Sequence, residues 1–151
     1  NLDTGETMIN LPNYEPIDEP YITLREYNEA LQEKTGNIVS CKLAARLLDG
    51  NNASLRLSNT KGNWLDVARF VPSFNEVNYP ATMTLLVRVG MLGYDDSEHL
   101  DNRGWDLDCE YPAITVCNPD EFKSALDDIF QLDVVTTAIC ELMANRPRVT
   151  L

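Results

Sequence analysis

The clearest pattern in the chain is an alternation of apolar and polar residues with a period of two, which begins at Ile38. Residues 39–47 place one apolar side chain at every second position, as in a strand with one buried and one wet face. The segment 49–52 reads Asp-Gly-Asn-Asn, which is strong turn chemistry, and residues 53–58 resume the alternation. The sequence therefore predicts a β-hairpin.

Three further segments have the same character. Residues 64–71 lie between turn residues and Pro72. Residues 82–89 are the most apolar, which favours a place in the middle of the sheet. Residues 113–117 predict one more short strand.

Helical signals occur on both sides of these strands. Thr23 and Glu26 have the spacing of a capping box, and Gly36 supplies a left-handed stop, so a short helix is expected to begin at Thr23. Asn118 and Glu121 repeat the capping-box spacing near the C-terminus.

Pro119 follows this second cap at the first helical position, where its missing donor does no harm. An apolar stripe at helical spacing then runs through residues 122–143. The pattern predicts one long helix, or two helices that meet near Asp133.

These elements predict an α+β fold, with a mostly antiparallel sheet of about five to six strands packed against a C-terminal helical region. At 151 residues the chain suits one domain, and we assign residues 23–151 to it. Residues 1–22 are predicted to form an extended arm before the short N-terminal helix. Prolines recur in this arm at four-residue intervals: Pro12, Pro16 and Pro20.

The arm has two interpretations. It is either a loosely attached terminus or a segment that lies across a neighbouring subunit. The second interpretation rests on its many apolar residues, among which the anchors we select are Leu11, Tyr14, Ile17 and Tyr21.

Charge narrows the range of functions. The chain has 24 acidic against 12 basic residues, a formal charge of -12 and a pI of about 4.3. Such a field repels phosphate backbones and anionic lipid, so we expect neither direct nucleic-acid binding nor membrane binding.

The acids are densest between positions 95 and 110, where Arg103 is the one cation. We interpret residues 95–104 as a long surface loop, either merely solvated or used to dock a basic protein surface. The candidate partner-binding acids are Asp95, Asp96, Glu98, Asp101, Asp106, Asp108 and Glu110.

Asp106, Asp108 and Glu110 alternate with apolar residues, which would place the three carboxylates on one face of a strand. Such a group has the oxygen donors that calcium or magnesium prefers, although the residue order of an EF-hand is missing. A solvated sheet face explains the alternation as well, and we predict no metal and no cofactor.

Catalytic signatures are missing from the sequence. His99 is the only histidine, no serine lies in a nucleophile elbow, and no glycine-rich phosphate loop occurs. We therefore predict that the protein is not an enzyme.

The four cysteines form no Cys-x-x-Cys pair, which favours reduced thiols and a cytoplasmic location. The alternative is a secreted protein with disulfides, in which Asn52-Ala53-Ser54 would be a glycosylation acceptor. No stretch approaches the roughly 20 apolar residues of a membrane span.

The function predicted from these features is a non-catalytic interaction or assembly subunit, such as a structural or accessory protein of a virus. It would bind protein partners, some with basic surfaces, and form a homo-oligomer or larger assembly. One alternative is an acidic inhibitor that imitates nucleic acid and occupies a basic groove. Another is a metal-assisted hydrolase that uses the clustered carboxylates.

Overall fold

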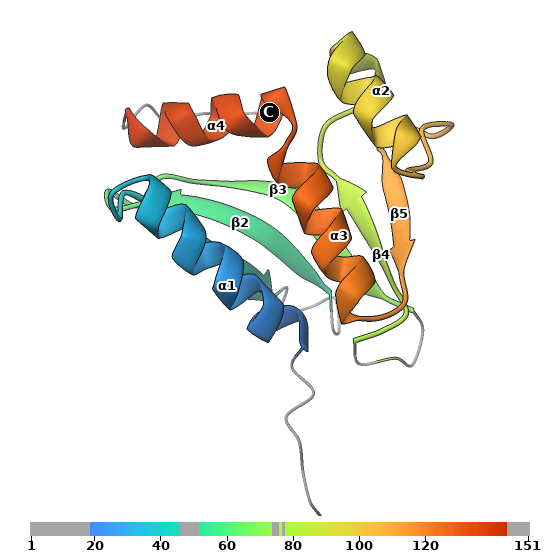
Figure 1. Ribbon diagram of the computed structural model, residues 1–151, viewed down its shortest axis with the longest axis horizontal. Coiled ribbons are helices and arrows are strands. Elements are labelled where there is room, and N and C mark those ends of the chain that lie inside the picture. Colours follow the sequence, from blue (N-terminus) through green and yellow to red (C-terminus); the bar gives the residue numbers. More distant parts are fainter. Residues whose placement is uncertain (1–18, 46–51, 74–75, 77, 145–151) are drawn as a thin grey trace, which may run out of the picture.

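The computed structural model of the chain describes residues 19–45, 52–73, 76 and 78–144, and it is an α+β structure (Figure 1). Its five strands form one antiparallel sheet in the order β1-β2-β3-β4-β5. The elements are α1 (Glu19–Lys34), β1 (Val39–Ala45), β2 (Ala53–Asn59), β3 (Trp64–Pro72), β4 (Ala81–Leu85), the 3-10 helix η1 (Val89–Met91), α2 (Tyr94–Asn102), β5 (Ala113–Val116), α3 (Pro119–Phe130) and α4 (Asp133–Met143).

The strand pairing of the predicted hairpin is confirmed by β1 and β2, whereas residues 49–51 of its predicted turn lie outside the described residues. Cys41 lies opposite Leu57 and Leu43 lies opposite Leu55, so the apolar positions of both strands share one face. A bulge in β3 extends the same division of faces from β2 to β3. Leu55 pairs with Ala68 on the apolar face, whereas Arg56 pairs with Asp66 on the polar face.

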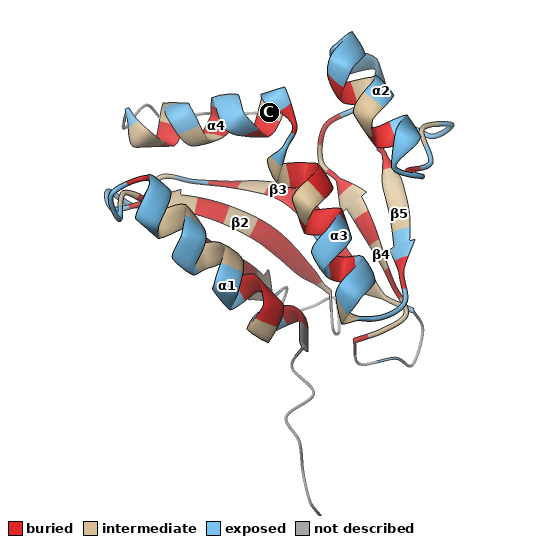
Figure 2. Cartoon of the chain, in the orientation of Figure 1, coloured by how far each residue is buried: buried red, intermediate tan, exposed pale blue. Residues whose placement is uncertain are grey.

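Helices α1 and α3 cover the apolar face of the sheet, and α4 runs across one end of β1 and β2 (Figure 1). The buried residues of β2 lie between these helices, while the outer sides of the helices are exposed (Figure 2). Phe122 of α3 contacts Phe70 of β3 edge-on, with ring centroids 5.2 Å apart. The core is thus a single layer between sheet and helices.

The first helix begins four residues earlier than predicted, at Glu19 instead of Thr23. Thr23 is buried inside the helix and caps nothing at its start. Pro20 was expected to favour extended chain, but it lies in the first turn of α1, where a proline removes no hydrogen bond. Residues 19–22 therefore belong to the folded unit, and the arm assignment was wrong for them.

Two other helix predictions are confirmed. Gly36 has φ +63° just after α1, as a left-handed stop requires. Asn118 Oδ1 accepts a hydrogen bond from Glu121 N at 2.9 Å, with Pro119 in the first turn of α3. The C-terminal stripe forms two helices, with α4 starting at Asp133.

Three predictions for residues 82–111 were wrong. Residues 95–102, which belong to the segment expected as a loop, form most of α2. Residues 105–111 form no strand, since Asp106 makes only an isolated bridge to Ala113. The strand predicted at 82–89 ends at Leu85, and the middle of the sheet is β3.

The described helices are too short or too polar to cross a membrane.

The thiols differ sharply in their surroundings. Cys41 is buried, and this burial raises the pKa of its thiol to about 12. Cys109, Cys117 and Cys140 are exposed. Because the thiolate is the reactive species, only the exposed thiols should react readily near neutral pH.

We predict that an aromatic disulfide reagent will modify three thiols quickly and the fourth only on unfolding. A Cys41→Ala variant should keep the three fast thiols and lose the slow one. Four equal rates in the native protein would show that Cys41 is not buried as described.

Candidate functional site

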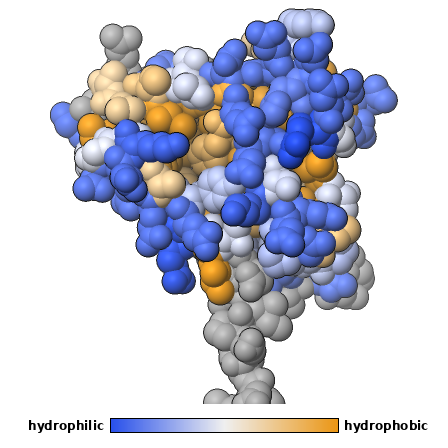
Figure 3. Space-filling view, viewed as in Figure 1, coloured by the Kyte–Doolittle hydropathy of each residue, from blue (hydrophilic) through white to orange (hydrophobic). Residues whose placement is uncertain are grey.

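The acidic segment is presented mainly on α2. Asp95, Glu98 and Asp101 are exposed on this helix, and Asp106, Asp108 and Glu110 are exposed in the segment that leads to β5. The surface above α2, at the upper right of the space-filling view, is almost entirely hydrophilic (Figure 3). Six of the seven predicted acids are therefore available to a partner.

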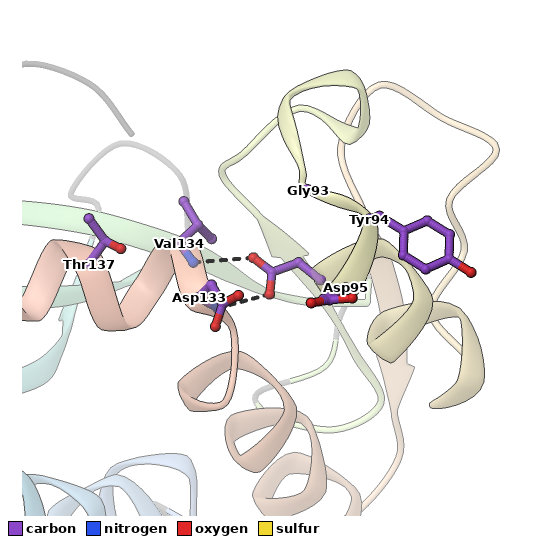
Figure 4. A pocket seen from close by; sticks show the side chains of 7 residues that line it. Gly93, Tyr94, Asp95, Asp133, Val134 and Thr137 are labelled. Carbon is purple, nitrogen blue, oxygen red and sulfur yellow. Dashed lines mark hydrogen bonds between the residues drawn. The ribbon is translucent and has the colours of Figure 1, made fainter.

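Asp96 is the exception, because it is buried between α2 and α4 with only 6 % of its surface exposed. Its carboxylate accepts backbone hydrogen bonds from Asp133 N at 2.8 Å and from Val134 N at 3.2 Å (dashed in Figure 4). These amides open α4, whose own N-cap residue Leu132 supplies no side-chain cap. Asp96 thus fills the electropositive helix end instead of facing a partner.

A cavity of about 380 Å³ lies beside this contact. Asp95, Asp133 and Thr137 line it, together with the start of α2 (Figure 4). Within the described ranges, no three histidine, cysteine, aspartate or glutamate side chains are grouped so as to hold a metal ion. We assign no ligand to this cavity.

The other end of α2 is fixed to α3 by Asp128, which is 3 % exposed. Its two oxygens accept hydrogen bonds from Arg103 Nε at 2.8 Å and from Trp105 Nε1 at 2.9 Å. Because both donors lie within three residues of the end of α2, the helix is held by a buried carboxylate at each end.

Two large apolar residues lie at the start of this acidic region. Met91 is 72 % exposed and Tyr94 is 76 % exposed. The Tyr94 hydroxyl donates a hydrogen bond to Glu98 Oε2 at 2.9 Å. We define the α2 surface as Met91, Tyr94, Asp95, Glu98 and Asp101. Met91 and Tyr94 were not among the residues predicted from sequence, although the chain places both just before the run of acids.

The strand face predicted for Asp106, Asp108 and Glu110 does not exist. Asp106 Oδ1 accepts a hydrogen bond from the backbone of Asp108 at 2.9 Å, and Glu110 forms an exposed ion pair with Arg88 at 3.2 Å. The geometric basis of the metal-assisted hydrolase alternative was therefore wrong.

His99 lies half-buried on α2, and not in a loop. Its Nε2 atom is buried and has no hydrogen-bond partner in the described part of the chain. The serine-histidine arrangement considered from sequence gains no support from this position.

Of the four apolar anchors predicted in the arm, the structure describes one. Leu11, Tyr14 and Ile17 lie outside the described residues, and Tyr21 is on α1 with 45 % of its surface exposed.

An apolar groove of about 330 Å³ lies between α1, α3 and α4. Tyr27 stacks on Phe130 there, with centroids 5.7 Å apart, and Leu31 and Ile139 add apolar side chains to the lining. Lys34, Asp127 and Gln131 are its polar members. The Tyr27 hydroxyl donates a hydrogen bond to Asp127, and burial together with this carboxylate raises the pKa of Tyr27 well above its usual range.

Comparisons with protein-family models, with curated proteins and with solved structures give no match to this chain. The function is therefore inferred from the α2 surface and from the apolar groove between α1, α3 and α4.

We predict that Asp96→Ala lowers the free energy of unfolding by about 1–3 kcal/mol, because the first two amides of α4 lose a charged acceptor. Asp95→Ala is the matched control on the same helical turn, and its effect should stay within about 0.5 kcal/mol. Urea unfolding followed by tryptophan fluorescence measures both.

Hydrogen exchange supplies the second readout. The amides of Asp133 and Val134 should exchange faster in Asp96→Ala than in Asp95→Ala. Equal stability and equal exchange in the two variants would contradict the role given to Asp96.

Proposed function

We propose that this chain is a non-catalytic assembly subunit whose copies bind one another, with the α2 surface as one of the contact regions. The observation that carries the proposal is the α2 surface itself, where Met91 and Tyr94 are exposed just before and at the start of a helix that also exposes Asp95, Glu98 and Asp101. An exposed apolar centre with charged neighbours is the usual composition of a protein-binding site.

The way α2 is held supports this proposal. Asp96 binds the start of α4, and Asp128 binds the two donors that follow α2. A surface already fixed in place loses little conformational entropy when a partner binds. Acidic residues on a helix held at both ends are thus better suited to recognition than the same residues on the long surface loop expected from sequence.

The second part of the proposal is that residues 1–18 bind a neighbouring copy. Residues 1–18 contain the apolar anchors Leu11, Tyr14 and Ile17, which would need an apolar surface to bind. The groove between α1, α3 and α4 offers half-buried Leu31, Phe130 and Ile139. An arm from a neighbouring copy would bury these side chains.

We predict that neutralising the acids of the α2 surface weakens self-association. The variant Asp95→Asn, Glu98→Gln, Asp101→Asn removes three charges with little change in shape. The matched control, Glu26→Gln, Glu29→Gln, Glu33→Gln, removes the same charge from exposed positions on α1. Sedimentation velocity at low and high salt compares both with the parent chain, since contacts between charged surfaces weaken with salt.

Only the α2 variant should shift toward monomer. A parent chain that stays monomeric at every soluble concentration would end the proposal of self-assembly. Equal shifts in the two triple variants would show that net charge, and not the α2 surface, controls association.

We also predict that removing residues 1–18 lowers the mass of the assembly while the fold is kept. The cut must precede Glu19, because Thr23 and Leu24 of α1 are buried and a longer deletion would damage the core. Light scattering gives the mass and circular dichroism gives the fold. A folded protein of unchanged mass would remove the arm from the proposal.

A further inference from the structure

The sheet has a second face, which the described helices leave uncovered (Figure 1). Strand alternation places Lys42, Arg56 and Asp66 in register across β1, β2 and β3 on this outer sheet face. Leu55 and Leu57, the neighbours of Arg56 along β2, point into the core with 0 % exposure, whereas Arg56 is half-buried and Lys42 is exposed. The outer sheet face is therefore accessible at Lys42, Arg56 and Arg69, whereas Ser54, in register with Arg69 on the same face, is buried.

This face has the opposite charge from the rest of the molecule. The described strands contain three cations, Lys42, Arg56 and Arg69, and one acid, Asp66. Asp66 is bound to Arg56 by hydrogen bonds of 2.7 and 3.2 Å. Lys42 and Arg69 are exposed, and neither forms an ion pair with a side chain in the described part of the chain. Their charges are free to attract an acidic surface.

An exposed tryptophan lies at the edge of the same group. Trp64 is 53 % exposed, and the guanidinium carbon of Arg56 lies 3.8 Å from its ring centroid. The cation-π contact and the Asp66 hydrogen bonds fix Arg56, which in turn fixes one side of the indole. A rigid tryptophan with a free side is a typical anchor residue of protein interfaces.

We propose that the outer sheet face binds the α2 surface of a second copy of this chain. This inference rests on the proposed assembly function and names the two surfaces that meet. Lys42 and Arg69 would face Glu98 and Asp101, while the apolar centres at Trp64 and Tyr94 would pack together. Opposite charges around matched apolar centres give both attraction and register.

The two surfaces cannot satisfy each other within one chain. Lys42 lies on the edge strand β1, whereas α2 lies beside β4 and β5 at the other side of the sheet (Figure 1). The contact is therefore heterologous, and each copy keeps one surface free for the next copy. Repetition of such a contact produces a ring or a filament.

A charge-swap experiment tests the contact. One variant carries Lys42→Glu and Arg69→Glu on the outer sheet face, which leaves the pair Arg56–Asp66 intact. The second carries Glu98→Lys and Asp101→Lys on the α2 surface. A third variant combines all four changes. The matched controls carry Arg25→Glu with Lys123→Glu, and Glu29→Lys with Glu33→Lys, at exposed positions on α1 and α3.

Sedimentation velocity should show that each two-residue swap alone weakens self-association about tenfold or more. An equal mixture of the two swapped proteins should assemble again, and so should the four-residue variant, because opposite charges then face each other. The controls should assemble as the parent chain does. Circular dichroism checks that each variant is folded, and if the sheet swap does not fold, Lys42→Ser with Arg69→Thr takes its place.

The outcomes separate this inference from the proposed function. If the parent chain assembles and the folded sheet variant assembles equally well, the outer sheet face is not the contact, although the assembly function stands. If the mixture and the four-residue variant stay dissociated, the pairing of these two surfaces is wrong. A monomeric parent chain removes both proposals. A single-stranded oligonucleotide that binds the parent chain but not the sheet variant would assign the face to nucleic acid and overturn the inference.

Discussion

Burial of one face of the sheet is the constraint on which the other features depend. Leu55 and Leu57 of β2 are fully buried, as is Met83 of β4, and each such side chain contributes roughly 1.5–3 kcal/mol relative to exposure. Since these residues share one face, α1 and α3 must pack against that face to shield it from water. The opposite face then keeps the polar half of each alternation, including Lys42 and Arg56, and is left open.

Two buried carboxylates determine where α2 lies. Taking a carboxylate out of water costs several kcal/mol unless hydrogen bonds replace the lost solvation. Asp96 obtains them from the opening amides of α4, and Asp128 obtains them from Arg103 and Trp105. Each contact joins segments far apart in sequence, so the exposed acids of α2 are held on a fixed support.

The acidic segment also shows where sequence reasoning fails. Asp96 and Leu100 are four residues apart and both are buried on the inner side of α2. A leucine in place of Asp96 would have revealed an apolar stripe and predicted a helix. An aspartate hides that stripe, because a sequence does not distinguish a carboxylate bound to amides of a distant helix from one in water. The same limit hid the ion pairs of Asp128 and Glu110.

The sequence by itself determined the hairpin of β1 and β2, the capped start of α3, the left-handed stop after α1 and the α+β class. Each of these follows from contacts between residues close in the chain or from a repeated local period. Only the tertiary structure decided that Asp96 is buried, that β3 is the central strand, and that Trp64 stands with Arg56 on an open face away from α2. These features depend on which distant segments meet, and that choice is made by packing the whole core at once.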